Sequence, residues 1–424
     1  MKDTFNFIIL LLICTHLYSK NIKKNYKNSE DKLLFVLENF RHGARGPYDG
    51  MNRKAYLDFI GEKWDGIGEL TPLGLRMLYL LGISTRNKYS NFLSKTYNPL
   101  ELYIFSTDFN RTLNSANSFL QGLYNNQTSI NLTQTQIDRS NILNSNYSDK
   151  IKIKIEELEN ETLQGGIDLI PVHIVDRSKL EYGLYETINC PGIEKYKNNN
   201  KNRPEVINII EDLLRHTNET YGQNIFKFMN ISNDPNYLWN KNKTNNLYLA
   251  DTFISDYFNG REMNYIKNSG LDMESFYNNS LNVTFINTYY SEFGISSTET
   301  VIIGVSSMFR DMFNYMDKRI ELDKKNKSDE MTSNSPRFII VSAHDSCLAP
   351  IDIFMQTEFG IDLDQAIYSS SRNFELWKND TTGNYSIHYL INLEEKAVFD
   401  FYLFKEKVLP KLYTPEQIKK ICYP

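Results

Sequence analysis

The sequence lacks an excess of positive charge. Lysine and arginine together number 47, against 52 aspartates and glutamates, which gives a formal net charge of -5. This balance argues against nucleic acid and against a polybasic membrane-binding surface as partners. Any site for an anion must therefore be a local group of arginines. The 424 residues, 41% of them apolar, suffice for one large domain or two ordinary ones.

Long hydrophobic runs are also lacking after the first twenty residues. No later stretch reaches the roughly 18 apolar residues of a membrane-spanning helix, so we expect the mature protein to be soluble. Residues 1–20 have Lys2 and then an apolar run from Phe5 to Cys14. This pattern predicts a secretory signal peptide cleaved near Ser19. A membrane anchor is the alternative, but the run is short for one.

Cysteine is scarce, with four residues and no Cys/His cluster at zinc-binding spacing, and we predict neither a metal nor a cofactor. Cys14 leaves with the signal peptide. In an oxidising compartment the remaining three give one disulfide and one free thiol. We predict Cys190–Cys422, because Cys190 lies in a loop-like Asn-Cys-Pro-Gly and Cys422 in the last turn of the chain. Cys347 lies in an apolar stretch and is predicted to be buried and unreactive.

Asparagine is plentiful, and many copies stand in Asn-x-Ser/Thr sequons, which agrees with secretion and predicts a glycoprotein from a lysosome, an acidic vacuole or the cell exterior. The sequons include Asn126, Asn131, Asn146, Asn218, Asn230, Asn282 and Asn384. Fewer than half should carry glycan, because chance alone produces many in such a sequence. Asn110 should stay bare, since it stands in a candidate active-site stretch.

Strand-like and helix-like segments alternate along the chain. Central strands are predicted at 31–40, 101–108, 171–176 and 335–345, and edge strands at 386–393 and 396–404. Helices are predicted at 69–89, 110–124, 204–217 and 298–325, the first with Thr71 as N-cap and Pro72 at its first position. This alternation predicts an α/β fold with a mostly parallel central sheet and helices on both faces.

The middle of the chain differs from this pattern. Residues 178–296 are helical in pattern, aromatic and rich in asparagine, and we predict that they form a helical cap inserted into the α/β domain. The predicted organisation is a signal peptide at 1–20, α/β segments at 31–177 and 297–424, and the cap between them. We find no internal repeat and no coiled coil.

Three motifs follow three predicted strands. RHGARGP (41–47) follows the first, Arg111 in FNRT follows the second, and His344-Asp345 follows RFIIVSA. Because ligands of open parallel sheets bind beyond the carboxyl ends of the strands, these motifs should meet at one rim. Three arginines (Arg41, Arg45 and Arg111) would repel one another unless a dianion neutralised them, and their planar donor forks match phosphate oxygens.

The motifs therefore predict phosphoryl chemistry without a metal. A neutral His42 is a nucleophile suited to phosphorus and would form a phosphohistidine that water then cleaves. The arginines and His344 would stabilise the transferring group. Asp345 is the candidate general acid for the leaving alkoxide, and because it must be protonated, we expect an acid pH optimum. The other histidines of the mature chain, His173, His216 and His388, belong to no cluster and are taken as structural.

With these residues in view, the sequence resembles the histidine acid phosphatases, the branch of the histidine phosphatase superfamily that contains the prostatic and lysosomal acid phosphatases. The matching stretches are LLFVLENFRHGARGP, GELTPLGLRMLYLLG, IFSTDFNRTLNSA, FIIVSAHDS and SSSRNFELW. They run from about residue 31 to residue 377, with a looser match in the helical middle.

The resemblance implies the same roles: His42 as nucleophile, Asp345 as proton donor, and a phosphate pocket made by Arg41, Arg45, Arg111 and His344. It also implies an α/β domain with a helical cap, a disulfide from the middle of the chain to its C-terminus, and small phosphate monoesters as substrates. Many members dimerise, so a homodimer is compatible with it. The chain departs from the family in having fewer cysteines, which leaves the rigidity of the cap open.

Several functions fit these residues. An acid phosphomonoesterase of broad specificity is the leading prediction. The alternatives are a specialised member such as a phytase or a lysophosphatidic acid phosphatase, a mutase, and a phosphate-binding protein without activity. A mutase of this superfamily is usually cytosolic, which the signal peptide opposes, and a binding protein would not need both His42 and Asp345.

Overall fold

The computed structural model describes residues 31–48, 63–64, 66–124, 131–140, 149–165, 167–174, 190–217, 219–220, 243–261, 270, 272–296 and 298–424. The predicted signal peptide lies outside these ranges, as do the sequons at Asn126, Asn146, Asn218 and Asn230.

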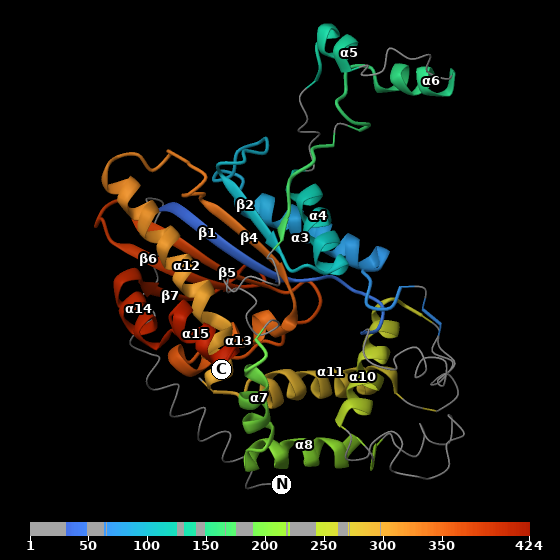
Figure 1. The fold of residues 1–424 in the computed structure, drawn as a ribbon, viewed down its shortest axis with the longest axis vertical. Helices are drawn as coiled ribbons and strands as arrows, with labels where there is room; N and C mark the ends of the chain where they lie inside the picture. The colour runs from blue at the N-terminus through green and yellow to red at the C-terminus, as the bar shows by residue number, and fades with distance from the viewer. Residues whose placement is uncertain are drawn as a thin grey trace.

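A seven-stranded mixed sheet forms the centre of the molecule, in the order β3-β2-β4-β1-β5-β6-β7 (Figure 1). The strands are β1 (Asp31–Arg41), β2 (Leu102–Ser106), β3 (His173–Ile174), β4 (Phe338–Ala343), β5 (Ser371–Asn379), β6 (Tyr385–Ile391) and β7 (Glu394–Asp400). The first four strands in this order pair in parallel, whereas β5, β6 and β7 are added antiparallel to β1 and to one another. The predicted α/β fold with a mostly parallel core is confirmed.

Helices cover both faces of this sheet because its central strands are apolar on both sides. In β4, Phe338 and Ile340 join the core under α3 (Pro72–Lys88) and α4 (Asn110–Leu123). Ile339 and Val341 point the other way, into the core under α12 (Glu299–Lys324), α13 (Asp345–Phe359) and α14 (Phe401–Val408). This alternation is the two-residue period of a strand buried on both faces.

The predicted helix starts agree with the structure. Thr71 caps α3 by accepting a hydrogen bond from the Gly74 amide, and Pro72 is the first helical residue. The prediction of a strand over 396–404 was wrong in its second half, because β7 ends at Asp400. The Asp400 carboxylate accepts hydrogen bonds from the amides of Tyr402 and Leu403, which starts α14 there.

Strand β5 was missed as a strand because several of its buried residues are polar or charged and stand between its buried apolar residues. Arg372, Asn373 and Glu375 are all at most 2% exposed. Arg372 is buried because its guanidinium pairs with Asp352 on α13, and the hydroxyls of two buried tyrosines bond to the same carboxylate. A search for alternating apolar residues misses a strand whose buried polar side chains form hydrogen bonds and ion pairs within the protein.

The elements described between Ile193 and Glu292 are all helical, and we call them the helical insertion. They are α7 (Ile193–Lys201), α8 (Pro204–Thr217), α10 (Lys243–Phe258), α11 (Met273–Phe285) and the π-helix η3 (Ile286–Glu292). Figure 1 shows them together at one end of the molecule, below the sheet. The limits predicted for a cap domain stay a prediction.

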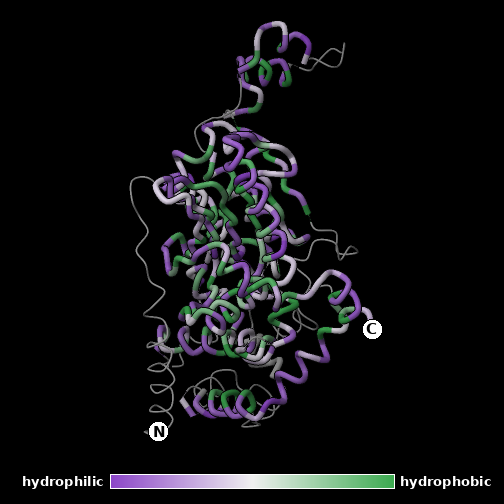
Figure 2. The backbone as a smooth tube through the Cα atoms, turned by 90° about the vertical axis from the view of Figure 1, so that its left-hand side faces the viewer, coloured by the Kyte–Doolittle hydropathy of each residue, from purple (hydrophilic) through white to green (hydrophobic). Residues whose placement is uncertain are grey.

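The remaining elements lie at the periphery. Two short helices, α5 (Gln134–Ser140) and α6 (Asp149–Leu158), project away from the sheet at the opposite end, as Figures 1 and 2 both show. Residues Leu409–Lys411 form a single 3-10 turn (η4), and α15 (Pro415–Cys422) is the last helix of the described chain. A disulfide joins Cys190, just before α7, to Cys422, and Cys347 is a free thiol. Within the described ranges, no helix has the length and apolar character needed to cross a bilayer.

Candidate active site

The ends of three parallel strands bring the predicted motifs together. Arg41, the last residue of β1, is paired with Ala343 at the end of β4, and the register of β2 places Ser106 beside Ser342. The residues that follow each strand therefore emerge at the same edge of the sheet. The His42 amide donates to the Ala343 carbonyl at 3.0 Å, which holds the start of the RHGARGP segment against β4.

The first glycine of this segment, Gly43, allows it to pack closely against a helix. A Cβ on Gly43 would collide with the backbone of Gly74, and a Cβ on Gly74 would collide with the carbonyl of Ala44. The two glycines thus let the segment lie directly on the first turn of α3, and Thr71 bonds to the Ala44 carbonyl beside them. The sequence suggested only that Gly43 allows a close backbone approach; the structure identifies the partner as α3.

His42 is buried, with 2% of its surface exposed. Its Nδ1 lies 2.9 Å from the carbonyl oxygen of Gly43. A carbonyl only accepts hydrogen bonds, so Nδ1 carries the ring proton and Nε2 keeps its lone pair. Burial lowers the pKa of His42 well below its ordinary value, and the neighbouring charges of Arg41, Arg111 and Arg45 lower it further. The imidazole is therefore neutral at mildly acid pH.

Arg41 is held by three contacts. Its Nη1 donates to the Ala366 carbonyl at 2.7 Å, its Nη2 pairs with Asp345 at 2.9 Å, and its guanidinium stacks 4.7 Å from the centre of the Tyr368 ring. The Tyr368 ring is also 5.8 Å from the His42 ring. These contacts fix both side chains of the Arg41–His42 pair.

Arg45 and Arg111 are the other two arginines whose charges act on His42. Arg45 is buried and makes a two-point ion pair with Asp251 of α10, with Nη2 and Oδ1 2.9 Å apart. Although burial lowers the pKa of Arg45, the Asp251 charge more than compensates, so the net shift is upward. Burial and the charge of Arg45 lower the pKa of Arg111 to about 10. Both guanidinium groups stay protonated in acid.

The three arginines share one unusual feature. The Nε atoms of Arg41, Arg45 and Arg111 are all buried and make no hydrogen bond within the described protein. Each unsatisfied buried donor costs about 1–3 kcal/mol, more when it is charged. Three such donors on arginines beside one neutral histidine have the chemistry that an oxyanion would satisfy.

His344 and Asp345 complete the site. His344 caps the start of α13 and lies 3.0 Å from the Thr107 hydroxyl through Nε2 and 3.5 Å from Arg111 Nη2 through Nδ1. Asp345 is the first residue of α13, and 36% of its side chain is exposed. One of its oxygens pairs with Arg41 and the other accepts the Ser346 amide.

A cavity of about 470 Å³ opens over these groups. Its wall includes His42, Arg45, Arg111, His344 and Asp345; Arg41 is not among the described wall residues but pairs with Asp345. The other described wall residues are Tyr48, Ile67, Gly68, Glu69, Asp108, Phe109, Asn110 and Ser346. The structure thus brings all six predicted site residues together. Their catalytic roles stay proposals.

Two neighbours of the site were not found from the sequence. Asp251 lies in the helical insertion, 206 residues after its partner Arg45, and Tyr368 lies in the segment before β5. An aspartate and a tyrosine in these positions have no local signature, since only the tertiary fold brings them to the arginines. The motif SSSRNFELW marked the region of Tyr368 but not the residue.

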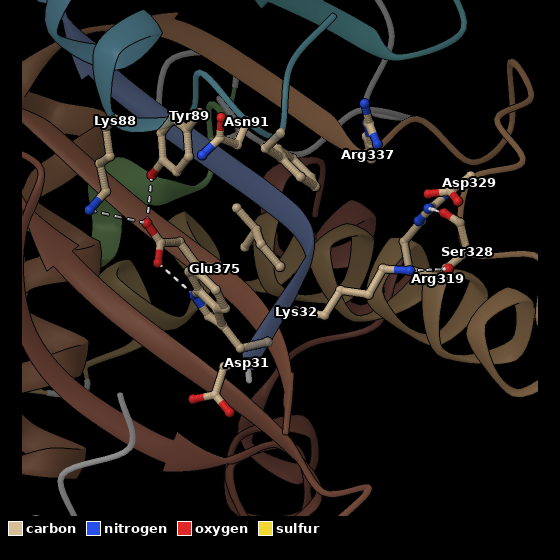
Figure 3. A pocket seen from close by; sticks show the side chains of 13 residues that line it. Asp31, Lys32, Lys88, Tyr89, Asn91, Arg319, Ser328, Asp329, Arg337 and Glu375 are labelled. Carbon is tan, nitrogen blue, oxygen red and sulfur yellow. Dashed lines mark hydrogen bonds and ion pairs between the residues drawn. The ribbon is translucent and has the colours of Figure 1, made fainter. Parts of the chain in front are cut away.

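A second cavity, of about 570 Å³, lies at the opposite end of β1 (Figure 3). Its inner wall holds the Glu375 carboxylate, which accepts hydrogen bonds from Tyr89 Oη and Trp377 Nε1, each at 2.7 Å, and lies 3.6 Å from Lys88 Nζ. The charges of Glu375 and Lys88 thus face each other within the protein. The fully buried Glu38 lies close behind this group.

Comparison with known proteins agrees with the geometry. The histidine phosphatase superfamily (branch 2) matches residues 20–392. Lysosomal acid phosphatase of Rattus norvegicus is 24% identical over 404 residues, which cover 91% of this chain and 80% of that protein. Testicular acid phosphatase of Mus musculus is 43% identical over 96 residues, which are 22% of this chain and only 23% of that protein.

Solved structures resemble the fold. The phytase of Klebsiella sp ASR1 superposes with a TM-score of 0.55 at 11% identity, over 91% of this chain and 97% of that one. A phytase of Hafnia alvei, in complex with myo-inositol hexakis sulphate, gives the same score at 12% identity over 92% of this chain. At such identities the likeness establishes the fold alone. The chain belongs to the histidine phosphatase superfamily, branch 2, and is by that membership a phosphatase.

Proposed function

We propose that the protein is an acid phosphatase that hydrolyses phosphate monoesters through a phosphohistidine on His42. The observation that supports this proposal is that three arginines with buried, unpartnered Nε–H donors act on a neutral His42, whose Nε2 keeps its lone pair. A phosphoryl group would satisfy all three donors and present its phosphorus to the one ring nitrogen that can attack. The charge that a metal would otherwise supply comes from three guanidinium groups.

In the first step, the Nε2 lone pair attacks phosphorus and the phosphorus–oxygen bond to the leaving alcohol breaks. The Asp345 carboxyl gives its proton to the leaving oxygen, so the alcohol departs neutral. In the free protein this carboxylate is paired with Arg41. A bound phosphoryl dianion competes for Arg41, which loosens that pair and frees the carboxyl to reach the leaving oxygen.

In the second step, water attacks phosphorus from the side that the alcohol left. Asp345, now a carboxylate, takes a proton from this water as the bond between nitrogen and phosphorus breaks. Phosphate and neutral His42 are released together. The hydrogen bond from His42 Nδ1 to the Gly43 carbonyl holds the ring in place through both steps.

The remaining cavity wall favours substrates with a single phosphate. Away from the arginines it carries the carboxylates of Glu69 and Asp108, and no lysine is among its described residues. Further phosphate groups on a substrate would meet these negative charges. This supports a general phosphomonoesterase over a phytase, which the likeness in fold to phytases does not address.

We also propose that the protein works in an acidic compartment reached through the secretory pathway. The apolar run in residues 1–20, the Cys190–Cys422 disulfide and relatives named lysosomal acid phosphatases support this location. N-terminal sequencing of the mature protein should find residues 1–20 removed. An intact Met1 in the mature protein would contradict the proposal.

The test of activity is hydrolysis of p-nitrophenyl phosphate by the purified protein across acid and neutral pH, with and without EDTA. We expect an acid optimum that EDTA does not change, no turnover by His42→Ala, and normal turnover by the matched control His216→Ala, since His216 is exposed on α8. Asp345→Asn should slow alkyl phosphates far more than p-nitrophenyl phosphate. Loss of activity in EDTA, or turnover by His42→Ala, would refute the mechanism.

A further inference from the structure

The RHGARGP segment rests on the helical insertion as well as on the sheet. Ala44 is fully buried and packs in one apolar cluster with Ile254 of α10. Asn259, just after α10, donates to the Arg45 carbonyl at 3.5 Å. Asp251 of α10 holds the Arg45 guanidinium by two oxygens. Helix α10 and the residue that follows it therefore contact the phosphate-binding segment at three points.

The Asp251 contact determines which edge of Arg45 is left for a ligand. Asp251 Oδ1 and Oδ2 accept from Nη2 and Nη1, and Nη1 also donates to the Gly46 carbonyl. The Nε–H remains buried and without a partner. Asp251 also accepts the Tyr48 amide, so the same carboxylate fixes the backbone beyond Arg45. With Asp251 only 13% exposed, this pair is largely shielded from water.

We infer that Asp251 is a positioning residue for phosphate binding: it orients Arg45 so that the Nε edge faces the oxyanion, and it makes the site depend on α10. This inference rests on the proposed function and names a residue that acts through Arg45 rather than on the substrate. Removing the Asp251 carboxylate has two opposing effects. It leaves the site more positive, which attracts an anion, and it frees Arg45 to turn.

Orientation outweighs charge in this site. Arg41 and Arg111 already attract the anion, so one further uncompensated charge adds little. A released Arg45 would turn toward the next carboxylate, Asp345, whose charge already acts on it, and would compete there with Arg41. The lost contact is a charge-assisted hydrogen bond to phosphate, so affinity should fall about 10- to 100-fold.

The experiment measures the Kd of inorganic phosphate by calorimetry, and kcat and KM with p-nitrophenyl phosphate, at acid pH. Asp251→Ala should raise Kd about 10- to 100-fold and lower kcat/KM at least as much. Asp251→Glu should recover part of the affinity. Asp251→Asn, which keeps the shape and one acceptor oxygen, should also weaken binding and serves if the alanine variant does not fold.

Asp256→Asn is the matched control, because Asp256 lies on α10 like Asp251 and its buried carboxylate pairs with another arginine, Arg261. This variant should lower the Tm but leave the Kd of phosphate within twofold. Unchanged or tighter phosphate binding by the Asp251 variants would overturn the inference, as would an equal loss in Asp256→Asn.

The calorimetric readout separates this inference from the proposed function. A wild-type protein that binds phosphate but does not hydrolyse the ester would refute the function, while the Asp251 variants would still decide the inference. Normal turnover with unaltered binding in those variants would refute the inference alone. A wild-type protein that binds no phosphate would refute both.

Discussion

Glu38 gives the folded protein a stability that decreases as the pH rises. Glu38 lies on β1 with its side chain fully buried, and the carboxyl accepts a hydrogen bond from the Thr85 hydroxyl at 3.0 Å. Burial raises the pKa of Glu38 from 4.5 to about 8, although hydrogen bonds from Thr85 and Asn373 oppose this shift; Glu375 raises the pKa and Lys88 lowers it. The folded protein therefore keeps this proton at pH values where the unfolded chain has lost it.

The magnitude follows from the two pKa values. Below pH 4.5, Glu38 is protonated in both the folded and the unfolded state, so its titration does not lower the free energy of unfolding. Between pH 4.5 and pH 8 the folded state binds more protons than the unfolded state, so the free energy of unfolding falls by about 1.4 kcal/mol per pH unit. By pH 7 the loss is about 3 kcal/mol, a large part of the stability of an ordinary domain.

The assay is urea denaturation of the wild type and Glu38→Gln between pH 4 and pH 8. The variant removes this titration, so it should gain about 3 kcal/mol relative to the wild type as the pH rises from 4.5 to 7. Below pH 6.5, His42 makes the free energy of unfolding rise with pH, because folding lowers the pKa of His42. This contribution is present in both proteins and therefore cancels in the difference between them. Glu406→Gln, on the exposed side of α14, is the control and should track the wild type. A difference between Glu38→Gln and the wild type that does not change with pH would refute the reasoning.

Three further perturbations test the packing around the site. Tyr368→Leu removes the ring stacked on Arg41 and should lower kcat/KM about tenfold, whereas Tyr368→Phe keeps the ring and should stay within threefold of the wild type; equal losses in both variants would contradict this. Gly74→Ala places a methyl group against the Ala44 carbonyl and should lower the free energy of unfolding by about 1–3 kcal/mol in urea; an unchanged midpoint would contradict the close approach. Replacing both cysteines of the disulfide by serine should cost about 2–5 kcal/mol in the same assay, and no loss would show that the bond does not stabilise the fold.

The residues at the centre of the site were predictable because they directly follow the ends of strands. RHGARGP, FNRT and SAHD each follow an apolar run, and the geometry of parallel strands then requires the three motifs to meet. Arginine and histidine at the ends of parallel strands also indicate specific chemistry, namely anion binding and nucleophilic attack. The helix starts at Thr71 and Pro72 were readable for a similar reason, since capping depends on neighbouring residues only.

The features that escaped prediction depend on partners distant in the sequence. Asp251 is an ordinary helical aspartate until α10 lies on the RHGARGP segment. The buried polar residues of β5, such as Arg372, conceal the strand because their stabilisation comes from α13 and from the helical insertion. A local sequence pattern predicts secondary structure, but it does not predict these contacts, because they join residues that are distant in the sequence.

The covalent intermediate is the most direct test of the account. The wild-type protein is mixed with radiolabelled p-nitrophenyl phosphate at acid pH, quenched in base within milliseconds, digested, and mapped by mass spectrometry. The account predicts one base-stable, acid-labile phosphoryl group on the peptide that contains His42, its absence in His42→Ala, and its accumulation in Asp345→Asn with this good leaving group. Label on another residue, or turnover without any labelled His42 peptide, would contradict the phosphohistidine mechanism.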